Sequence, residues 1–579
     1  MQALRAGPLT AVLDGVDLRY VRLGELELVR RIYVAVRDRN WNTIPGVASG
    51  FELDEREDSF EARFSVRHTS HDTDFSWHGT ISGTPAGRIA FAMDGRGERD
   101  MLYNRVGFCV LQPWRECAGR SFRGETPDGP VAGTLPLLVA PQRFENGVYV
   151  PLFPSVSWLE IDLENGPTAV FEFEGDLFET EDQRNWTDAS FKTYCTPLAL
   201  GFPRELKQGQ ALAQTVTVSA AGRTGAASEA PPPRLDIGAP TGARVPPVGL
   251  ALAAGDPSAQ EETLLRELAP AHLRADVHLA DPAWPEQLVR ALRVCGELGS
   301  PLELALFVRE GDDLDPLRNA LAGADVARVL VAPEGAQTVT PEETTPPGLV
   351  AFVRDALGLD GVPIAGGTDM YFCELNRTRP QTAAMDGVFW SLNGQVHAFD
   401  DVSLLETPEA QGEQVRAAQA FAGGKPLFVG PVTLKRRYNV NATIADAAPD
   451  PPDPRQMTPF AAVWTAASAK HLAEQGAAAI TYFETTGPLG VVAAGEPFPV
   501  HRALASVSAL RGGEILACET TRPLELAGLA VRHGARTTLL AANLTPHAQT
   551  VEVRGIPTVD SLELGPYELA RIDSEGETT

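Results

Sequence analysis

The stretch that decides the fold is VGLALAAGDPSAQEETLLRELAPAHLRADVHL, residues 248–279. It holds two short apolar runs, VGLALAA and LRADVHL, on either side of SAQEETLLRELAP, whose apolar residues recur with helical spacing. The order strand, helix, strand predicts a βαβ unit, in which the two strands are parallel.

The same alternation continues along the chain as far as residue 483. Eight βα units over about 250 residues predict a TIM-like (β/α)8 barrel. A doubly wound open sheet is the alternative, but no glycine-rich phosphate loop follows the first strand. The eight strand candidates are residues 248–254, 273–279, 302–308, 326–333, 362–367, 387–393, 426–430 and 477–483.

Other kinds of pattern flank the predicted barrel. Residues 1–222 alternate apolar and polar side chains between turn signals, as in FEARFSVRHT, which predicts a β-sandwich. Residues 223–246, rich in Pro, Gly and Ala, are predicted to be a linker. The barrel domain is expected over residues 247–500 and a small C-terminal β-sandwich domain over 501–579. A Pro/Asp loop at 446–456 is a candidate lid.

The amino-acid composition limits which classes of binding partner are expected. The 579 residues contain 76 Asp and Glu against 49 Lys and Arg, a formal net charge of −27. An acidic chain repels phosphates, so nucleic acid and anionic membrane partners are not expected. Six scattered cysteines and the lack of a signal-peptide pattern predict a cytoplasmic protein with free thiols. The oligomeric state stays open.

The candidate site follows from the barrel, because functional side chains of such barrels collect at the C-terminal ends of the strands. We predict catalytic roles for Glu374, Glu484, His397 and Asp401. Predicted substrate-binding residues are Asp369, Tyr371, Asn376, Asn393, Gln395, Tyr482, Asp276 and His278. Lys435, Arg436 and Arg437 follow the seventh strand and receive no assigned role.

Two carboxylates on opposite strands suit acid–base hydrolysis of an ester or a glycoside. Glu484 follows the buried-looking run AAAITYF, where a carboxylate needs a partner or a purpose. His397 beside Asp400 and Asp401 is a candidate base, although it equally suits a turn. Asp369 can equally cap a turn. No HxH or HExxH spacing occurs, so we expect neither a metal nor another cofactor.

A further polar and aromatic stretch lies in the N-terminal part, between residues 173 and 194. It contains Glu181, Asp182, Arg184, Asn185, Trp186 and Asp188. These groups suit either a sugar-binding cleft or a salt-linked joint between domains. We favour the joint, because the acids, amides and arginine can satisfy one another.

Five strings, in matching order between residues 104 and 487, resemble the D-apionate lactonase family of branched-pentose catabolism. They are NRVGFCVLQP, ETEDQRNWTDASFKTYCTPL, GGTDMYFCELNR, QVHAFDD and FETTG. The first two also resemble the galactose-mutarotase type of super-sandwich. The resemblance implies that sandwich, a TIM-like barrel and a C-terminal β domain. One departure is Gly394, where the family pattern has proline.

The activity that the resemblance implies is hydrolysis of D-apionolactone, a five-membered sugar lactone, to D-apionate. A glycoside hydrolase using Glu374 and Glu484, and a non-catalytic carbohydrate-binding protein, are the alternatives. Many retaining glycosidases of this barrel type carry Asn-Glu at the fourth strand. Here the fourth strand ends with Glu334 without the asparagine, which speaks against ordinary membership.

Overall fold

The computed structural model describes residues 1–145, 148–164, 166–222, 231–335, 344–437 and 451–575. These residues divide into two compact units. The first holds residues 1–184 and 189–222, and the second holds residues 185–188, 231–437 and 451–575.

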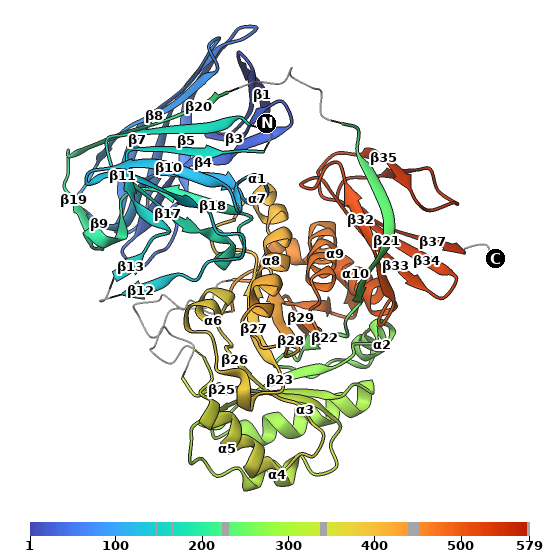
Figure 1. The fold of residues 1–579 in the computed structure, drawn as a ribbon. Helices are drawn as coiled ribbons and strands as arrows, with labels where there is room; N and C mark the ends of the chain where they lie inside the picture. Colours follow the sequence, from blue (N-terminus) through green and yellow to red (C-terminus); the bar gives the residue numbers. More distant parts are fainter. Residues whose placement is uncertain (146–147, 165, 223–230, 336–343, 438–450, 576–579) are drawn as a thin grey trace. The chain divides into compact units, whose positions relative to one another are not determined.

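Two antiparallel sheets of nine strands each make up most of the described first unit (Figure 1). Strand β6 (Phe60–Thr69) alternates buried and exposed residues, as its sequence predicts. The buried faces form one large core that includes Phe64, Trp77, Phe91 and Phe108. This confirms the predicted N-terminal β-sandwich.

The strands of the first sheet are, in spatial order, β1 (Gln2–Ala6), β2 (Leu9–Asp14), β3 (Asp17–Leu23), β4 (Leu26–Asp38), β9 (Met101–Pro113), β18 (Ser190–Tyr194), β17 (Phe178–Asp182) and β14 (Phe153–Val156), with β19 (Arg204–Leu206) on β9. Those of the second are β11 (Gly129–Thr134), β10 (Ser121–Thr126), β15 (Trp158–Asp162), β16 (Thr168–Glu174), β20 (Ala211–Ala221), β8 (Arg88–Gly97), β7 (Asp74–Thr84), β6 and β5 (Gly46–Glu55). This unit also holds the hairpin of β12 (Arg143–Glu145) and β13 (Val148–Val150) and the short helix α1 (Trp114–Cys117).

In the described second unit, eight parallel strands close into a barrel, because the first pairs with the eighth. This confirms the predicted (β/α)8 architecture. Strand β24 is buried at all seven positions, as expected for a parallel strand covered on both faces. The eight strands are β22 (Val248–Ala251), β23 (Leu273–His278), β24 (Leu302–Val308), β25 (Val326–Pro333), β26 (Ile364–Gly367), β27 (Val388–Asn393), β28 (Leu427–Thr433) and β29 (Ala479–Thr486).

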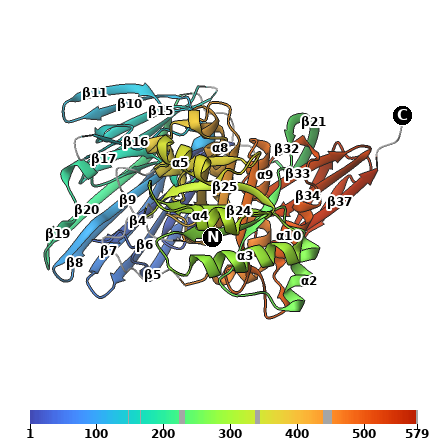
Figure 2. The ribbon, with the colours of Figure 1, turned by 90° about the horizontal axis from the view of Figure 1, so that it is seen from below.

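Helices surround these strands, and Figure 2 shows α3, α4 and α5 on the side of β24 and β25. Helix α2 starts where the sequence predicts, with a capping box in which Ser258 and Glu261 accept each other's backbone N–H. The helices are α2 (Ala259–Leu268), α3 (Trp284–Leu298), α4 (Asp315–Ala320), α5 (Pro347–Leu357), α6 (Phe372–Thr378), α7 (Asp401–Glu406), α8 (Pro408–Gln419), α9 (Pro459–Glu474) and α10 (Pro499–Ser508). Two short strands, β30 (Gly490–Ala493) and β31 (Glu496–Pro497), follow β29.

Alternate residues of each barrel strand point inward and fill the interior. A buried cluster includes Ala305 and Phe307 of β24 with Leu330 and Ala332 of β25. Toward the N-terminal ends of the strands the interior turns polar. There His272 Nε2 lies 2.8 Å from Thr481 Oγ1 and 3.5 Å from Glu303 Oε2. A side chain at Gly249 would clash with the His272 ring, since a Cβ there would lie 2.3 Å away.

The buried His272 predicts a loss of stability in acid. Burial lowers its pKa to about 4, although the Glu303 carboxylate opposes that effect. Because the pKa in the folded chain lies below the ordinary 6.5, the stabilisation is complete above pH 6.5 and is lost as the pH falls toward 4. Between pH 6.5 and pH 4, the free energy of unfolding measured with urea is expected to fall less in His272→Gln than in the wild type. An equal fall in the two proteins would contradict the assignment of this acid effect to His272.

The C-terminal sheet is built partly from a strand that precedes the barrel. Strand β21 (Arg234–Arg244) pairs antiparallel with β32 and parallel with β35. It lies inside the stretch 223–246 that the composition predicts to be a linker. The register shifts around Pro240, so the residues that suggest a linker sit at an irregularity of the strand.

This sheet packs against α9, where the rings of Phe460 and Tyr567 lie 5.6 Å apart. In the described residues its order is β36 (Ser561–Leu564), β35 (Gln549–Arg554), β21, β32 (Glu514–Thr520), β33 (Leu526–His533), β34 (Arg536–Asn543) and β37 (Leu569–Glu575).

Candidate active site at the mouth of the barrel

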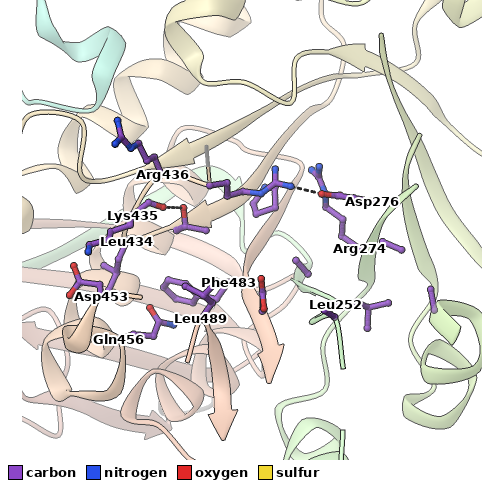
Figure 3. A pocket seen from close by; sticks show the side chains of 18 of the residues that line it. Leu252, Arg274, Asp276, Leu434, Lys435, Arg436, Asp453, Gln456, Phe483 and Leu489 are labelled. Atoms are coloured by element: carbon purple, nitrogen blue, oxygen red, sulfur yellow. Dashed lines mark hydrogen bonds and ion pairs between the residues drawn. The ribbon is translucent and has the colours of Figure 1, made fainter. Parts of the chain in front are cut away.

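A cavity of about 440 Å³ opens beside the C-terminal ends of strands β22, β23, β28 and β29. Its size lies in the range of small-molecule sites, about 300–1,000 Å³. Figure 3 shows Arg274 and Asp276 on one side, Asp453 and Gln456 on the other, and Phe483 between them. The charged residues that line it are Arg274, Asp276, Arg290, Lys435, Arg436, Arg437, Asp453 and Glu484.

Arg274 is the buried centre of an ion network beside the cavity. Its side chain is fully buried, and its Nε donates to Asp276 Oδ1 at 2.7 Å. Nη1 donates to the carbonyl oxygen of Gly430 at 2.8 Å, and Nη2 donates to Asp369. A buried charge is tolerated only when it is paired and hydrogen-bonded in this manner.

Arg437, from the segment after β28, joins the same two carboxylates. Its Nη1 lies 2.9 and 3.0 Å from the two carboxylate oxygens of Asp369, and its Nη2 donates to Asp276. Its backbone N–H donates to the hydroxyl oxygen of Tyr371 at 3.1 Å. With 22% of its side chain exposed, Arg437 brings a fixed positive charge to the cavity wall.

Glu484 is the half-buried carboxylate of the cavity, at the end of β29. None of the described residues donates a hydrogen bond to its carboxylate. Burial raises its pKa, Arg437 lowers it and Asp276 raises it, and the net shift is upward. A raised pKa in a cavity is typical of proton-transfer groups.

A bulge in β29 brings Glu484 to the cavity. Leu250 pairs with Tyr482 but Ala251 pairs with Glu484, so Phe483 is an extra residue with φ of 34°. Left-handed backbone is uncommon for a residue other than glycine and costs about 1–3 kcal/mol. Phe483 and Glu484 consequently both line the cavity, while Tyr482 keeps the opposite orientation.

Tyr482 therefore lies away from the cavity. Its hydroxyl is fully buried 2.8 Å from Ser468 Oγ of α9, in the layer between strand and helix. Burial raises the pKa of this phenol. The residue predicted to bind substrate contributes to packing outside the barrel interior.

Glu374 is also absent from the described residues that line the cavity. It is buried in the first turn of α6, where its Oε2 accepts the backbone N–H of Tyr371 at 3.2 Å. Its other oxygen lies 3.8 Å from Arg377. The structure thus does not bring Glu374 and Glu484 together in the cavity, whereas it places Asp369 and Tyr371 against Arg437.

Asn376, Asn393 and Gln395 belong to a buried polar group at the ends of β26 and β27. Asn376 donates to Asn185 Oδ1 at 3.0 Å. Asn393 Oδ1 accepts from the backbone of Gln395 at 3.1 Å, while its Nδ2 has no partner among the described residues. Gly394 donates its backbone N–H to the carbonyl oxygen of Thr433, a bond that the proline expected at this position could not make.

Gln395 connects this group to the cavity, because its Nε2 donates to Asp453 Oδ2 at 2.6 Å. Burial raises the pKa of Asp453, but Arg455 and Gln395 outweigh it and lower the pKa to about 2. Asp453 is therefore a structural anion at neutral pH. Of the candidate lid at 446–456, residues 446–450 lie outside the described residues.

His397 is oriented by a carboxylate that comes from an earlier part of the sequence. Its Nδ1 lies 2.9 Å from Asp188 Oδ2, and its ring makes a T-shaped contact with that of Trp186, with the ring centroids 5.8 Å apart. Asp400 caps α7 through Ser403, and Asp401 pairs with Arg455 at 2.9 Å, with 55% of its side chain exposed. The partner expected from the neighbouring sequence is thus replaced by Asp188.

Three residues that make these contacts, Arg274, Arg437 and Asp188, are not among the predicted catalytic or substrate-binding residues. Arg274 lies two residues before Asp276, so strand alternation places both on one face, which the sequence signals. Arg437 follows the seventh predicted strand, but no nearby sequence pattern indicates its contact with Asp369. Asp188 lies 209 residues from its partner His397, and no sequence pattern connects the two.

Neither a membrane segment nor a metal cluster appears in the described part of the chain. None of its helices is long and apolar enough to cross a membrane. No group of three or more His, Cys, Asp or Glu side chains in it is arranged to hold a metal ion. All six cysteines are buried, and none of them forms a disulfide bond in the described part of the chain.

Comparison with known families matches almost the whole chain. Residues 1–223 match the N-terminal domain of D-apionate lactonase, residues 247–512 its TIM barrel domain, and residues 523–572 its C-terminal immunoglobulin-like domain. The last match identifies the C-terminal sheet as part of an immunoglobulin-like domain.

A D-apionate lactonase of Brucella anthropi is 27% identical over 606 aligned positions, covering 98% of this chain and 96% of that protein. Among solved structures, a GH30 endoxylanase from Clostridium papyrosolvens C71 is 12% identical, with a TM-score of 0.41 over 60% of this chain and 100% of that chain. A family 51 α-L-arabinofuranosidase from Bifidobacterium longum is 13% identical, with a TM-score of 0.41 over 60% of this chain and 95% of that chain. From the three domain matches and the full-length relative, the chain belongs to the D-apionate lactonase family and is a hydrolase of the lactonase type.

Proposed function

We propose that this protein hydrolyses D-apionolactone, a five-membered sugar lactone, to D-apionate in the barrel cavity. The full-length similarity to a D-apionate lactonase supports the reaction. The observation that carries the choice of site is Glu484, a cavity carboxylate with a raised pKa and no hydrogen bond from any described residue. A proton-transfer group needs both a suitable pKa and room for water or substrate.

In the proposed reaction the Glu484 carboxylate takes a proton from a water molecule as that water attacks the lactone carbonyl carbon. The carbonyl oxygen becomes an oxyanion in the tetrahedral intermediate. When the bond between the carbonyl carbon and the ring oxygen breaks, the ring oxygen leaves as an alcohol and requires a proton. The product is an open-chain hydroxy acid, which ionises in neutral solution.

The charge that develops on the carbonyl oxygen needs a fixed positive group, because a preorganised charge stabilises the transition state without rearrangement. Arg437 is placed for this role, since Asp369 and Asp276 hold its guanidinium and part of it faces the cavity. Arg274 is fully buried and supports the two carboxylates that hold Arg437. Tyr371 fixes the backbone of Arg437 through its hydroxyl.

The first experiment follows acid release from aldonolactones, including D-apionolactone, with a pH indicator, with and without a chelator. Turnover of the five-membered sugar lactones is the expected result. A parallel panel of nitrophenyl glycosides tests the alternative reaction. Cleavage of glycosides with inert lactones would overturn the proposal, and binding of a lactone without its consumption would indicate a carbohydrate-binding protein.

The pH dependence of turnover tests the electrostatics of Glu484. Burial raises the pKa of Glu484, Arg437 lowers it and Asp276 raises it. Because the proposed reaction needs the ionised carboxylate, activity is expected to fall as acid protonates it. Arg437→Gln should move this acid limb to higher pH, and Asp276→Asn should move it to lower pH. Both shifts are read from kcat/KM against pH, with Glu514→Gln on the C-terminal sheet as a control. Shifts of the same sign in both variants would contradict the assignment.

A further inference from the structure

His278 and Glu334 form a pair at the mouth of the barrel. Nδ1 of His278, at the end of β23, lies 3.3 Å from Oε1 of Glu334, which follows β25. The His278 ring stacks on Phe307 of β24, with centroids 3.9 Å apart and planes 9° from parallel. Three neighbouring strands thus fix one imidazole.

Strand alternation places this pair on the interior face of the barrel. His278 lies two residues after Asp276, and Glu334 lies two residues after Ala332 of the interior cluster. His278 is in register with Phe307, another member of that cluster. The pair therefore lies at the C-terminal ends of the strands, the face on which barrel enzymes carry their catalytic groups.

The imidazole is held but not enclosed. Its side chain is 32% exposed, and its contact with Glu334 is its only hydrogen bond to a described residue. Because Nδ1 faces Glu334, Nε2 is the nitrogen left for a substrate. A carboxylate that orients one nitrogen and leaves the other for proton transfer is a recurring catalytic arrangement.

The Glu334 carboxylate is largely buried, although few hydrogen bonds compensate for its burial. Its side chain is 11% exposed, and its Oε2 is buried without a hydrogen-bond partner in the described chain. Leaving a buried acceptor unpaired costs about 1–3 kcal/mol. A role beyond packing accounts for keeping a carboxylate at this position.

Asp276 connects the pair electrostatically to the cavity. Burial raises the pKa of Asp276, and the charges of Arg274, Arg437 and His278 lower it. Asp276 in turn acts on Glu484. His278 does not itself line the cavity, but strand alternation places it on the same face of β23 as Asp276, which does.

We infer that His278 is a second proton-transfer group of the lactonase site and that Glu334 is its positioning residue. The inference rests on the proposed function. While Glu484 takes the proton of the attacking water, Nε2 of protonated His278 gives its proton to the ring oxygen as the carbon–oxygen bond breaks. Proton exchange through water then returns Glu484 to its carboxylate and His278 to its protonated form.

The test compares kcat and KM for aldonolactone hydrolysis by the full chain. His278→Asn is expected to lower kcat by about 10²–10⁴-fold, the usual contribution of general acid–base catalysis, with KM changed by less than about threefold. Glu334→Gln should lose part of kcat, and Glu334→Asp should recover some of that loss. His71→Asn, at a side chain 97% exposed, is the matched control.

Chemical rescue separates proton transfer from a structural role. Added imidazole is expected to raise the kcat of His278→Ala but not that of Glu484→Gln, because only the first variant lacks an imidazole. A His278→Asn enzyme with kcat within about threefold of the wild type would overturn the inference. So would a large loss in His278→Ala that imidazole leaves unchanged. Wild-type protein inert toward every lactone would instead overturn the proposed function.

Discussion

Replacing Glu484 by glutamine is expected to lower kcat for lactone hydrolysis by about 10²–10⁴-fold, with KM little changed. The amide has nearly the same shape but cannot take a proton from water. No described residue donates a hydrogen bond to the carboxylate, so the substitution disturbs few native contacts. The loss is measured as kcat at saturating lactone, and the fold is checked by circular dichroism and thermal unfolding.

Two further glutamate variants sharpen this experiment. Glu496→Gln makes the same chemical change at an exposed position after β30 and should leave kcat unchanged. Glu374→Gln tests the pair predicted from the sequence. Because Glu374 accepts a backbone bond inside α6 and does not line the cavity, we expect it to lose less kcat than Glu484→Gln. An equal loss of kcat in the two variants would support the predicted catalytic pair of Glu374 and Glu484. Full activity of Glu484→Gln would show that Glu484 has no catalytic role.

Replacing Asp369 by asparagine is expected to give the largest loss of stability. Asp369 accepts from both Arg274 and Arg437, and its side chain is only 2% exposed. Without its charge, the two neighbouring guanidinium groups lose a carboxylate that both of them contact, while Asp276 remains bonded to both. Removing one partner of a buried ion pair costs about 3–5 kcal/mol. For a unit of barrel size this corresponds to a fall in Tm of about 6–20 °C, which calorimetry measures.

The matched control is Asp236→Asn, which breaks the pair with Arg234 in β21. There 37% of the aspartate side chain is exposed, and surface pairs contribute about 0–1 kcal/mol. Adding Arg437→Met to Asp369→Asn should recover part of the loss, since it removes one of the two uncompensated cations. A loss in Asp369→Asn no larger than in Asp236→Asn would contradict the buried network.

Much of the fold could be predicted from sequence because its signals are local. Runs such as LELALFV and helices such as the one capped by Ser258 carry their periodicity within a few residues. The strand β21 escaped prediction because proline and glycine occupy an irregular strand. Its pairing with β32 and β35 depends on residues about 270 to 320 positions later, which no local pattern reveals.

The sequence predicted where in the barrel the site lies better than it predicted the role of each residue. Strand order places Asp276, Asp369 and Glu484 at the mouth of the barrel, and the structure gathers them around Arg274 and Arg437. It turns Tyr482 outward and encloses Glu374 in α6. These differences arise from one bulged residue and one helical turn, features too small to alter a hydrophobic pattern.

The sequence by itself determined eight βα units, their flanking β domains and the carboxylate Glu484 at the end of the last barrel strand. Apolar spacing is sufficient for this, because burial selects it residue by residue. Only the tertiary structure decided which groups act together. Barrel closure brings Arg274 to Asp369 across 95 residues and His397 to Asp188 across 209, and the left-handed turn at Phe483 directs Glu484 into the cavity. Such contacts depend on the meeting of distant strands and on single backbone angles, which local sequence does not encode.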